Sequence, residues 1–138
     1  MKYQYIGVFV SQEEIYAKVV GIGKRLAKLI KYPHVTFQYR PDTVDESLFG
    51  EEVKIKIVGY GNDEMNEGLK VELFTENPKL LSAIKEIAMP HITLSISNQG
   101  KAVNTRFLSF KDIEPFVIVG KYGGYMKDKD TIIIELWL

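Results

Sequence analysis

The alternation of apolar and polar residues divides most of the chain into short strands. Apolar residues recur at every second position in several stretches, which is typical of strands that bury one face. Val53, Ile55 and Ile57, for example, alternate with two lysines. On this pattern we predict strands over residues 3–10, 34–40, 53–57, 69–74, 91–97, 116–119 and 132–138, the last two joined by a turn at Tyr122-Gly123-Gly124-Tyr125.

Two other stretches have the apolar spacing of amphipathic helices. The first opens at Ser11 and Glu14, which form a capping box, and we expect it to end before Pro33. Gly21 and Gly23 lower the helix propensity in its middle but do not have to end it. The apolar stripe of this helix consists of Ile15, Val19, Ile22, Leu26 and Leu29.

The second helix lies in a second copy of the same order of elements. It begins at Asn77, which is a good N-cap residue, has Pro78 in its first turn, and ends before Pro90. A strand, a helix and a Pro-His-apolar-Thr segment therefore follow one another twice. The turn-rich segment 59–68 separates the two copies.

This repetition predicts one domain made of two related halves. A length of 138 residues is that of a single domain with a sizeable hydrophobic core. We predict an α+β fold over residues 1–138 in which two pseudo-symmetric lobes each combine an antiparallel sheet with a helix. The lobes would span residues about 1–64 and about 65–138, with a central cleft between them.

Composition narrows the classes of protein and of ligand. A hydrophobic content of 46% and a charged content of 26% are ordinary for a soluble globular protein, and no stretch is long and apolar enough to span a membrane. The chain has no cysteine, which excludes disulfides and favours a cytoplasmic location. Its 18 basic residues equal its 18 acidic ones, so any nucleic-acid ligand is expected to be short or bound at one end.

The candidate chemistry lies in the only two histidines of the chain, His34 and His91. Both occur in one pentapeptide pattern, PHVTF at 33–37 and PHITL at 90–94. Threonine fills 6 of the 138 positions, so Thr two residues after both histidines has a chance probability of roughly 0.2%. Imidazole is the side chain that titrates near neutral pH and serves as general acid or base.

Strand geometry explains the spacing of His and Thr within each motif. Residues i and i+2 point to the same face of a strand, so each His shares a face with its Thr, and Val35 or Ile92 points to the other. Two such polar faces across one cleft would place two imidazoles around a space lined with hydroxyls. The alternative is a pair of surface strands whose histidines only meet water. The first face consists of His34, Thr36, Gln38 and Arg40, and the second of His91, Thr93, Ser95 and Ser97.

These two motifs resemble those of the two-histidine (2H) phosphoesterase superfamily. Within it, the chain is most similar to the cyclic phosphodiesterase domain of fungal and plant tRNA ligases. The resemblance also rests on the early segment YIGV at 5–8 and the polar segment 100–104 after the second motif. It implies two lobes around a shared cleft and assigns catalysis to His34, Thr36, His91 and Thr93. Only 57 positions (91 − 34) separate the histidines, so substrate-binding loops are not carried over.

The resemblance implies a metal-independent hydrolase without cofactor. It would open 2',3'-cyclic phosphate ends of RNA or nucleotides to a 2'-phosphate, with one imidazole as base and the other as acid. Two alternatives are a hydrolase of cyclic oligonucleotide or ADP-ribose cyclic phosphate signals and a non-catalytic module that binds a nucleotide or RNA end. The sequence predicts neither the oligomeric state nor which histidine is the acid.

Three further residues are candidate substrate contacts. Tyr5 would stack on a base, Arg40 would hold the phosphate through its guanidinium, and Ser95 would extend the hydroxyl face. Each has a plainer alternative, namely core packing for Tyr5 and simple exposure for the other two. A zinc site is not expected, because the chain has two histidines and no cysteine.

Overall fold

The computed structural model describes residues 2–135, which form two α-helices, eight β-strands and three short 3-10 turns. The predicted α+β class is confirmed, because helices are few and the strands pair antiparallel in one open sheet. In chain order the elements are β1 (Tyr5–Phe9), α1 (Gln12–Lys18), β2 (Lys28–Leu29), β3 (His34–Tyr39), η1 (Glu46–Leu48), β4 (Glu52–Asn62), β5 (Asn66–Phe74), α2 (Pro78–Lys85), β6 (His91–Ile96), η2 (Ala102–Phe107), β7 (Lys111–Met126), η3 (Lys127–Lys129) and β8 (Thr131–Ile133).

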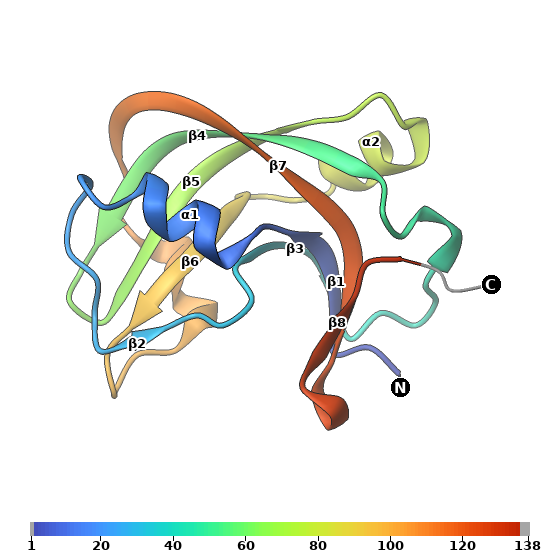
Figure 1. Cartoon of the computed structure of the whole chain (residues 1–138), viewed down its shortest axis with the longest axis horizontal. Coiled ribbons are helices and arrows are strands. Elements are labelled where there is room, and N and C mark those ends of the chain that lie inside the picture. Colours follow the sequence, from blue (N-terminus) through green and yellow to red (C-terminus); the bar gives the residue numbers. More distant parts are fainter. Residues whose placement is uncertain (1, 136–138) are drawn as a thin grey trace.

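All eight strands belong to one curled sheet. The order is β2-β6-β5-β4-β7-β1-β3, and β8 pairs with β7. The long strand β7 pairs with β4 on one side and with β1 on the other, so the two halves of the sequence share a continuous sheet. In Figure 1, β4 and β7 arch over the molecule from the part that carries β6 to the part that carries β1, and α1 lies beneath the arch.

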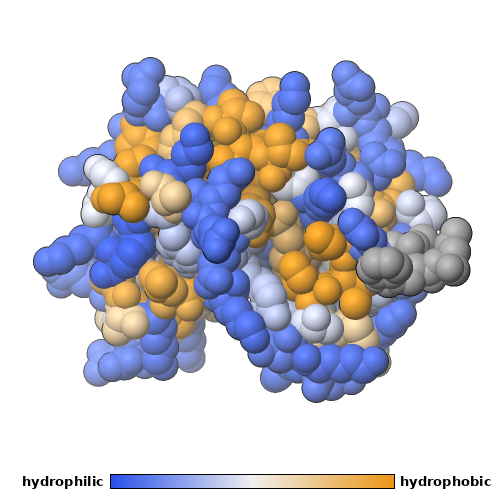
Figure 2. Space-filling view, in the orientation of Figure 1, coloured by the Kyte–Doolittle hydropathy of each residue, from blue (hydrophilic) through white to orange (hydrophobic). Residues whose placement is uncertain are grey.

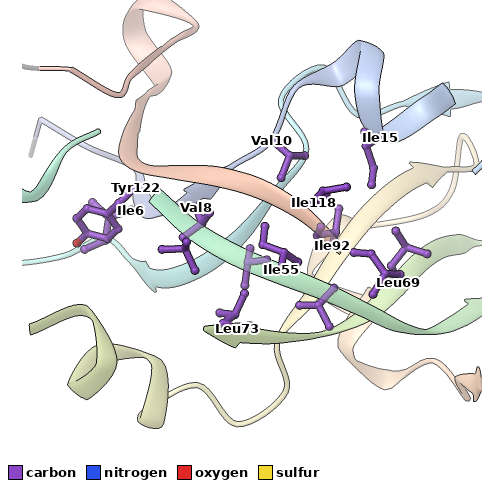
Figure 3. Close-up of a cluster of buried hydrophobic side chains, with 14 of the residues drawn as sticks. Ile6, Val8, Val10, Ile15, Ile55, Leu69, Leu73, Ile92, Ile118 and Tyr122 are labelled. Atoms are coloured by element: carbon purple, nitrogen blue, oxygen red, sulfur yellow. The ribbon is translucent and has the colours of Figure 1, made fainter. Parts of the chain in front are cut away.

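The core fills the concave side of this sheet. Fully buried Val53, Ile55 and Ile57 of β4 alternate with exposed or half-buried neighbours, as the sequence pattern predicts. Figure 3 shows the cluster to which β1, β5, β6 and α1 also contribute side chains, among them Val8 and Ile15. Burial of this apolar surface is the main stabilising term, and it holds the two ends of the sheet around α1.

The first helix is much shorter than predicted. Ser11 caps it as expected, because its hydroxyl accepts the Glu14 N–H at 3.2 Å, but the helix ends at Lys18. The prediction of a helix through Leu29 is therefore wrong. Gly23 takes a left-handed conformation with φ +58°, and the guanidinium of Arg25 binds backbone carbonyls of the segment that leaves the helix. In the longer helix that the sequence predicted, these carbonyls would accept backbone N–H groups. Here they accept the guanidinium of Arg25 instead.

Two predicted turns are instead parts of long strands. Most of the segment 59–68 belongs to β4 and β5, and the hairpin turn is limited to residues between Asn62 and Asn66. The chain also continues straight through Gly123 and Gly124 in β7, where a Cβ on Gly124 would lie 2.5 Å from the ring of Tyr3. The turn before β8 falls at η3, and residues 136–138 of the predicted last strand lie outside the described residues.

The surface is indented between the two ends of the sheet. The space-filling view shows this hollow between the part that carries β2 and the part that carries β8, and shows apolar surface where β7 crosses the sheet (Figure 2). Val117 and Val119 of β7 are exposed on that outer face. Neither helix within residues 2–135 combines the length and apolar character that crossing a membrane requires.

Candidate active site

The two histidine strands border one cleft of about 700 Å³. His34 and Thr36 reach it from β3, and His91 and Thr93 reach it from β6. The two strands lie near opposite ends of the sheet order, and they approach each other because the sheet curls around the core. The structure thus brings together all four residues of the paired motifs, which are 57 positions apart in sequence (91 − 34).

The hydroxyl of Tyr16 in helix α1 reinforces the link between β6 and the segment before the first motif, where the N–H of Ile30 also donates to the carbonyl of Leu94 at 3.1 Å. Tyr16 donates a hydrogen bond of 2.6 Å to the carbonyl of Leu94 in β6 and accepts the N–H of Ile30 at 3.0 Å. Ile30 itself lines the cleft, four residues before His34. The position of the first motif relative to the second therefore depends on this helix as well as on the sheet.

Both imidazoles are oriented by the same backbone contact. Nδ1 of His34 lies 2.8 Å from the carbonyl oxygen of Tyr32, and Nδ1 of His91 lies 2.8 Å from that of Met89. A carbonyl only accepts, so Nδ1 carries the proton and donates it in both rings. Each neutral ring then keeps Nε2 as its basic nitrogen.

The proline of each motif explains this contact. Both accepting carbonyls belong to the residue directly before a proline, and proline restricts that residue to extended conformations. The three-residue segments ending at His34 and His91 consequently present the same group to the same ring nitrogen. This gives Pro33 and Pro90 a positioning role in addition to ending the preceding segment.

The two threonines have different partners. The hydroxyl of Thr36 lies 3.0 Å from Nε2 of His34, whereas Thr93 donates to the hydroxyl of Thr105 at 2.8 Å. No hydrogen bond to Nε2 of His91 occurs within residues 2–135, and no buried side-chain nitrogen among them lacks a partner. Nε2 of His91 is therefore open to the solvent of the cleft, while Nε2 of His34 is already hydrogen-bonded.

Burial shifts the titration of both imidazoles in the same direction. Desolvation lowers the pKa of His34 to about 4, which the bond to the Tyr32 carbonyl opposes and the nearby His91 reinforces. The pKa of His91 is also lowered, first by burial and then by the positive charge of Arg106. Both rings are thus neutral at pH 7 in the free protein. An anionic ligand between them would favour protonation, because opposite charge stabilises the imidazolium.

A stack of aromatic rings fixes the plane of the His34 imidazole. Tyr5 stacks on His34 with a centroid distance of 4.3 Å and an interplanar angle of 15°, and it also stacks on Tyr125 at 5.1 Å. Phe9 packs against His34 at 5.4 Å. Tyr5 lines the cleft as the sequence suggested, but its ring contacts protein rings and supports His34.

The structure does not bring Arg40 or Ser95 to the cleft. Arg40 follows the end of β3 with φ +50°, which breaks the strand alternation, and its guanidinium lies over the ring of Tyr39 on the surface. Ser95 is fully buried, donates to Glu67 at 2.7 Å and accepts the N–H of Leu26 at 2.9 Å. Its hydroxyl therefore joins a buried network and has no free position for a ligand.

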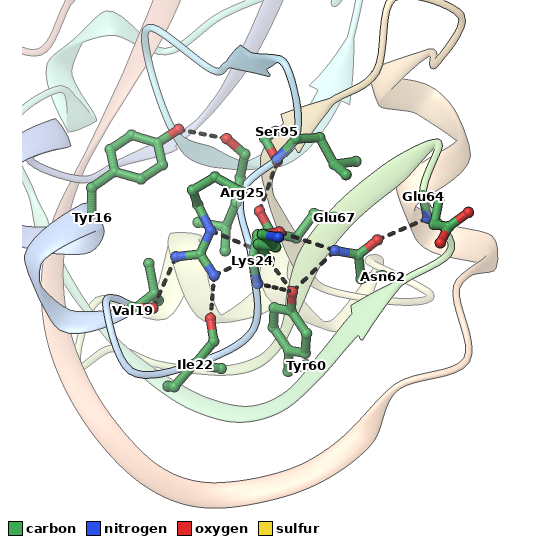
Figure 4. Close-up of polar contacts among 12 residues, drawn as sticks. Tyr16, Val19, Ile22, Lys24, Arg25, Tyr60, Asn62, Glu64, Glu67 and Ser95 are labelled. Atoms are coloured by element: carbon green, nitrogen blue, oxygen red, sulfur yellow. Dashed lines mark hydrogen bonds and ion pairs between the residues drawn. The ribbon is translucent and has the colours of Figure 1, made fainter.

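The sequence patterns did not predict this buried network. Figure 4 shows Arg25 and Glu67 at its centre, with a 2.7 Å ion pair between them, and Tyr60 donating to Glu67 at 2.6 Å. The network ties the segment after α1 to β4, β5 and β6. The same segment continues to Lys31 and Tyr32, which line the cleft.

Two basic residues of the cleft were also not predicted, Lys31 and Arg106. Lys31 forms a 2.7 Å ion pair with Asp130, whose other carboxylate oxygen accepts the hydroxyl of Tyr125 at 2.9 Å. Arg106 lies in η2, one residue after Thr105. Within residues 2–135, no three His, Cys, Asp or Glu side chains gather closely enough to hold a metal ion.

Comparison with known proteins identifies no relative of this chain, because no family model, curated protein or solved structure matches it.

Proposed function

We propose that this chain is a metal-independent phosphodiesterase that hydrolyses the 2',3'-cyclic phosphate of a nucleotide or RNA end. The observation that carries the proposal is the pair of imidazoles at one cleft, each with Nδ1 bound to a backbone carbonyl and Nε2 left as the basic nitrogen. The resemblance of both motifs to the 2H phosphoesterases supports the same reaction. We also retain, as parts of the proposal, the two pseudo-symmetric lobes and the cytoplasmic location that the sequence predicts.

The reaction needs one proton acceptor and one proton donor on opposite sides of phosphorus. A neutral imidazole takes a proton from water as its oxygen attacks phosphorus, and an imidazolium gives a proton to the ribose oxygen that leaves. The ring-opened product is a monophosphate, which is the 2'-phosphate if the 3' oxygen leaves. Each imidazole contributes about 10²–10⁴-fold to the rate through this proton transfer.

The lowered pKa values suit the role of base in the free protein, and the role of acid arises once substrate is bound. Both rings are neutral before substrate binds, so a base is available at once. The negative charge of the phosphate raises the pKa of the ring that becomes the acid. In the free protein the hydroxyl of Thr36 donates to Nε2 of His34. Once Nε2 is protonated it no longer accepts, and this hydroxyl can turn to donate to a non-bridging oxygen as charge develops there.

The test is hydrolysis of 2',3'-cyclic nucleotides and of short RNA with a cyclic phosphate end, in EDTA. Because the amide of Asn occupies the place of Nδ1, His34→Asn and His91→Asn keep the donor to the carbonyl and remove Nε2. Each substitution is expected to lower kcat by at least about 10²-fold. Gln38→Ala, an exposed change on the strand of His34, is the matched control.

Full activity of either Asn variant would refute the two-imidazole mechanism. Binding of these ligands by the wild-type chain without any turnover would instead support the binding module.

A further inference from the structure

The charged residues of the cleft are few and they balance. Four line it, namely Lys31, Glu86, Arg106 and Asp130. Lys31 is paired with Asp130 at 2.7 Å, whereas no ion pair or side-chain hydrogen bond of Arg106 occurs within residues 2–135. Arg106 is therefore the only permanently charged basic side chain of the described cleft that has no ion-pair partner.

The position of Arg106 is set by buried contacts. The preceding Thr105 is fully buried and accepts hydrogen bonds from Thr93 at 2.8 Å and from the Asn66 amide at 2.9 Å. Asn66 also donates to the carbonyl of Lys101 at 2.6 Å, which holds the start of η2. Gly68 leaves room for this packing, since a Cβ there would lie 2.3 Å from the Thr105 methyl group. The turn is thus bound to the strand that carries His91.

The guanidinium itself is exposed, and it packs over the ring of Phe107 with a centroid distance of 4.7 Å. Its charge also acts on the reacting group, because it contributes to the lowered pKa of His91. An arginine in this position suits a phosphoryl group, which its planar fork binds through two parallel hydrogen bonds.

We infer that Arg106 binds the phosphoryl group on which the imidazoles act and that the cleft accepts only this one phosphoryl group. The substrate class is then a 2',3'-cyclic monophosphate, either free or at an RNA end whose further phosphates lie outside the cleft. ADP-ribose cyclic phosphate and cyclic dinucleotides bring further phosphates into the cleft, where they would face Glu86 and Asp130 without a second cation that lacks an ion-pair partner. This inference rests on the proposed function and narrows it.

The rest of the lining suits the uncharged part of such a substrate. The cleft is also lined by apolar side chains that can contact a ribose and a base. Among them are Ile30, Ile87, Met89 and Val103.

The test compares three substrates and four proteins. Steady-state kinetics with adenosine 2',3'-cyclic monophosphate, ADP-ribose 1'',2''-cyclic phosphate and a cyclic dinucleotide would be measured for wild type, Arg106→Gln, Arg106→Lys and Arg40→Gln. Arg106→Gln is expected to lower kcat/KM for the cyclic monophosphate about 10- to 100-fold, the effect of losing a hydrogen-bonded charge. Arg106→Lys should lower kcat/KM by less, because the lysine ammonium still supplies a positive charge.

Arg40→Gln is the control, because Arg40 is also an exposed arginine but does not line the cleft, and it should change kcat/KM by less than about twofold. Adenosine 2'-monophosphate titrated into the same proteins gives a readout independent of turnover. Its Kd should rise in Arg106→Gln by a similar factor as kcat/KM falls.

Equal kinetics and equal Kd for wild type and Arg106→Gln would overturn the inference, as would equal kcat/KM on ADP-ribose 1'',2''-cyclic phosphate. Neither result would affect the proposed function, which fails only if the His→Asn variants remain active or no cyclic phosphate is hydrolysed.

Discussion

The hydroxyl of Thr93 donates a hydrogen bond to the buried hydroxyl of Thr105, 2.8 Å away. In the first motif the matching hydroxyl, that of Thr36, lies beside Nε2 of its own histidine. Two threonines that are equivalent in sequence therefore do different work in the folded chain. Thr36 contacts an imidazole of the cleft directly, and Thr93 anchors the turn that carries Arg106.

Replacing Thr105 by Val tests this anchoring. The change keeps the shape but removes the oxygen that accepts from Thr93 and Asn66. We expect the free energy of unfolding to fall by about 1–3 kcal/mol, since buried donors lose their partner. Urea denaturation measures it, with the exposed Thr43→Val as control. Equal stability of the two variants would show that the contact contributes nothing.

The lowered pKa of the half-buried His34 predicts a stability that depends on pH. Its pKa is lowered from 6.5 to about 4, so between these values the unfolded chain binds a proton that the folded chain does not. The free energy of unfolding should consequently fall as pH drops below 6.5, by at most about 1.4 kcal/mol for each unit of the shift. Above pH 7 this contribution is absent.

Urea midpoints at pH 7 and pH 5 measure this dependence. His34→Asn should lose less stability than wild type between the two values. A variant whose midpoint falls as much as that of wild type would mean that His34 titrates normally.

For the proposed phosphodiesterase, the same pKa shifts predict an optimum of activity on the acid side. Catalysis needs one neutral and one protonated imidazole, and kcat/KM reports the free protein, in which both pKa values are below 6.5. We expect a bell-shaped kcat/KM profile with its maximum below pH 6.5, and a kcat profile displaced upward by the bound phosphate. A flat kcat/KM between pH 5 and 8 would contradict the scheme.

Gly7 allows β1 and β3 to approach each other beneath the stacked rings. A Cβ there would lie 2.1 Å from the carbonyl oxygen of Val35, the neighbour of His34. Gly7→Ala should destabilise the fold by about 1–3 kcal/mol and lower activity by moving β3. Gly21→Ala is the control, because nothing lies within 4 Å of its Cβ position. Thermal melting of both proteins decides the matter, and similar Tm values would count against the close approach.

The ion pair between Arg25 and Glu67 should be strongly cooperative. Arg25→Met leaves a fully buried carboxylate without its charge partner, which costs about 3–5 kcal/mol. Adding Glu67→Leu should restore part of this loss, because no unpaired charge remains. A double-mutant cycle by urea denaturation measures the coupling. Strictly additive effects would indicate that the two charges do not stabilise each other.

The sequence patterns predicted those strands and helix starts that depend on residues close together in the sequence. Alternation placed β1, β3, β4, β5 and β6, and the N-caps Ser11 and Asn77 placed both helix starts. The end of α1 at Lys18 was not predictable in this way, because it depends on Arg25 reaching a carboxylate 42 positions further along the chain. The continuous β7 was missed for a related reason, since Gly124 sits in a strand to make room for Tyr3.

Within the cleft, the motif residues were predictable and their neighbours were not. His34, Thr36, His91 and Thr93 carry a spacing that strand geometry explains. Arg106 has no such pattern, and the only available signal was a basic residue in the polar stretch that follows the second motif. Ser95 followed the alternation but faces Glu67, opposite an irregularity in the pairing of β5 and β6.

The bond from each imidazole to the carbonyl two residues before it makes the tautomer a property of three consecutive residues. No carboxylate elsewhere in the fold is needed to decide which ring nitrogen is basic. The residues that line the cleft could accordingly be changed without changing which nitrogen of either imidazole is basic. The protonation of each imidazole thus depends on neighbouring residues in the sequence, whereas the shape of the cleft depends on residues from distant parts of the chain.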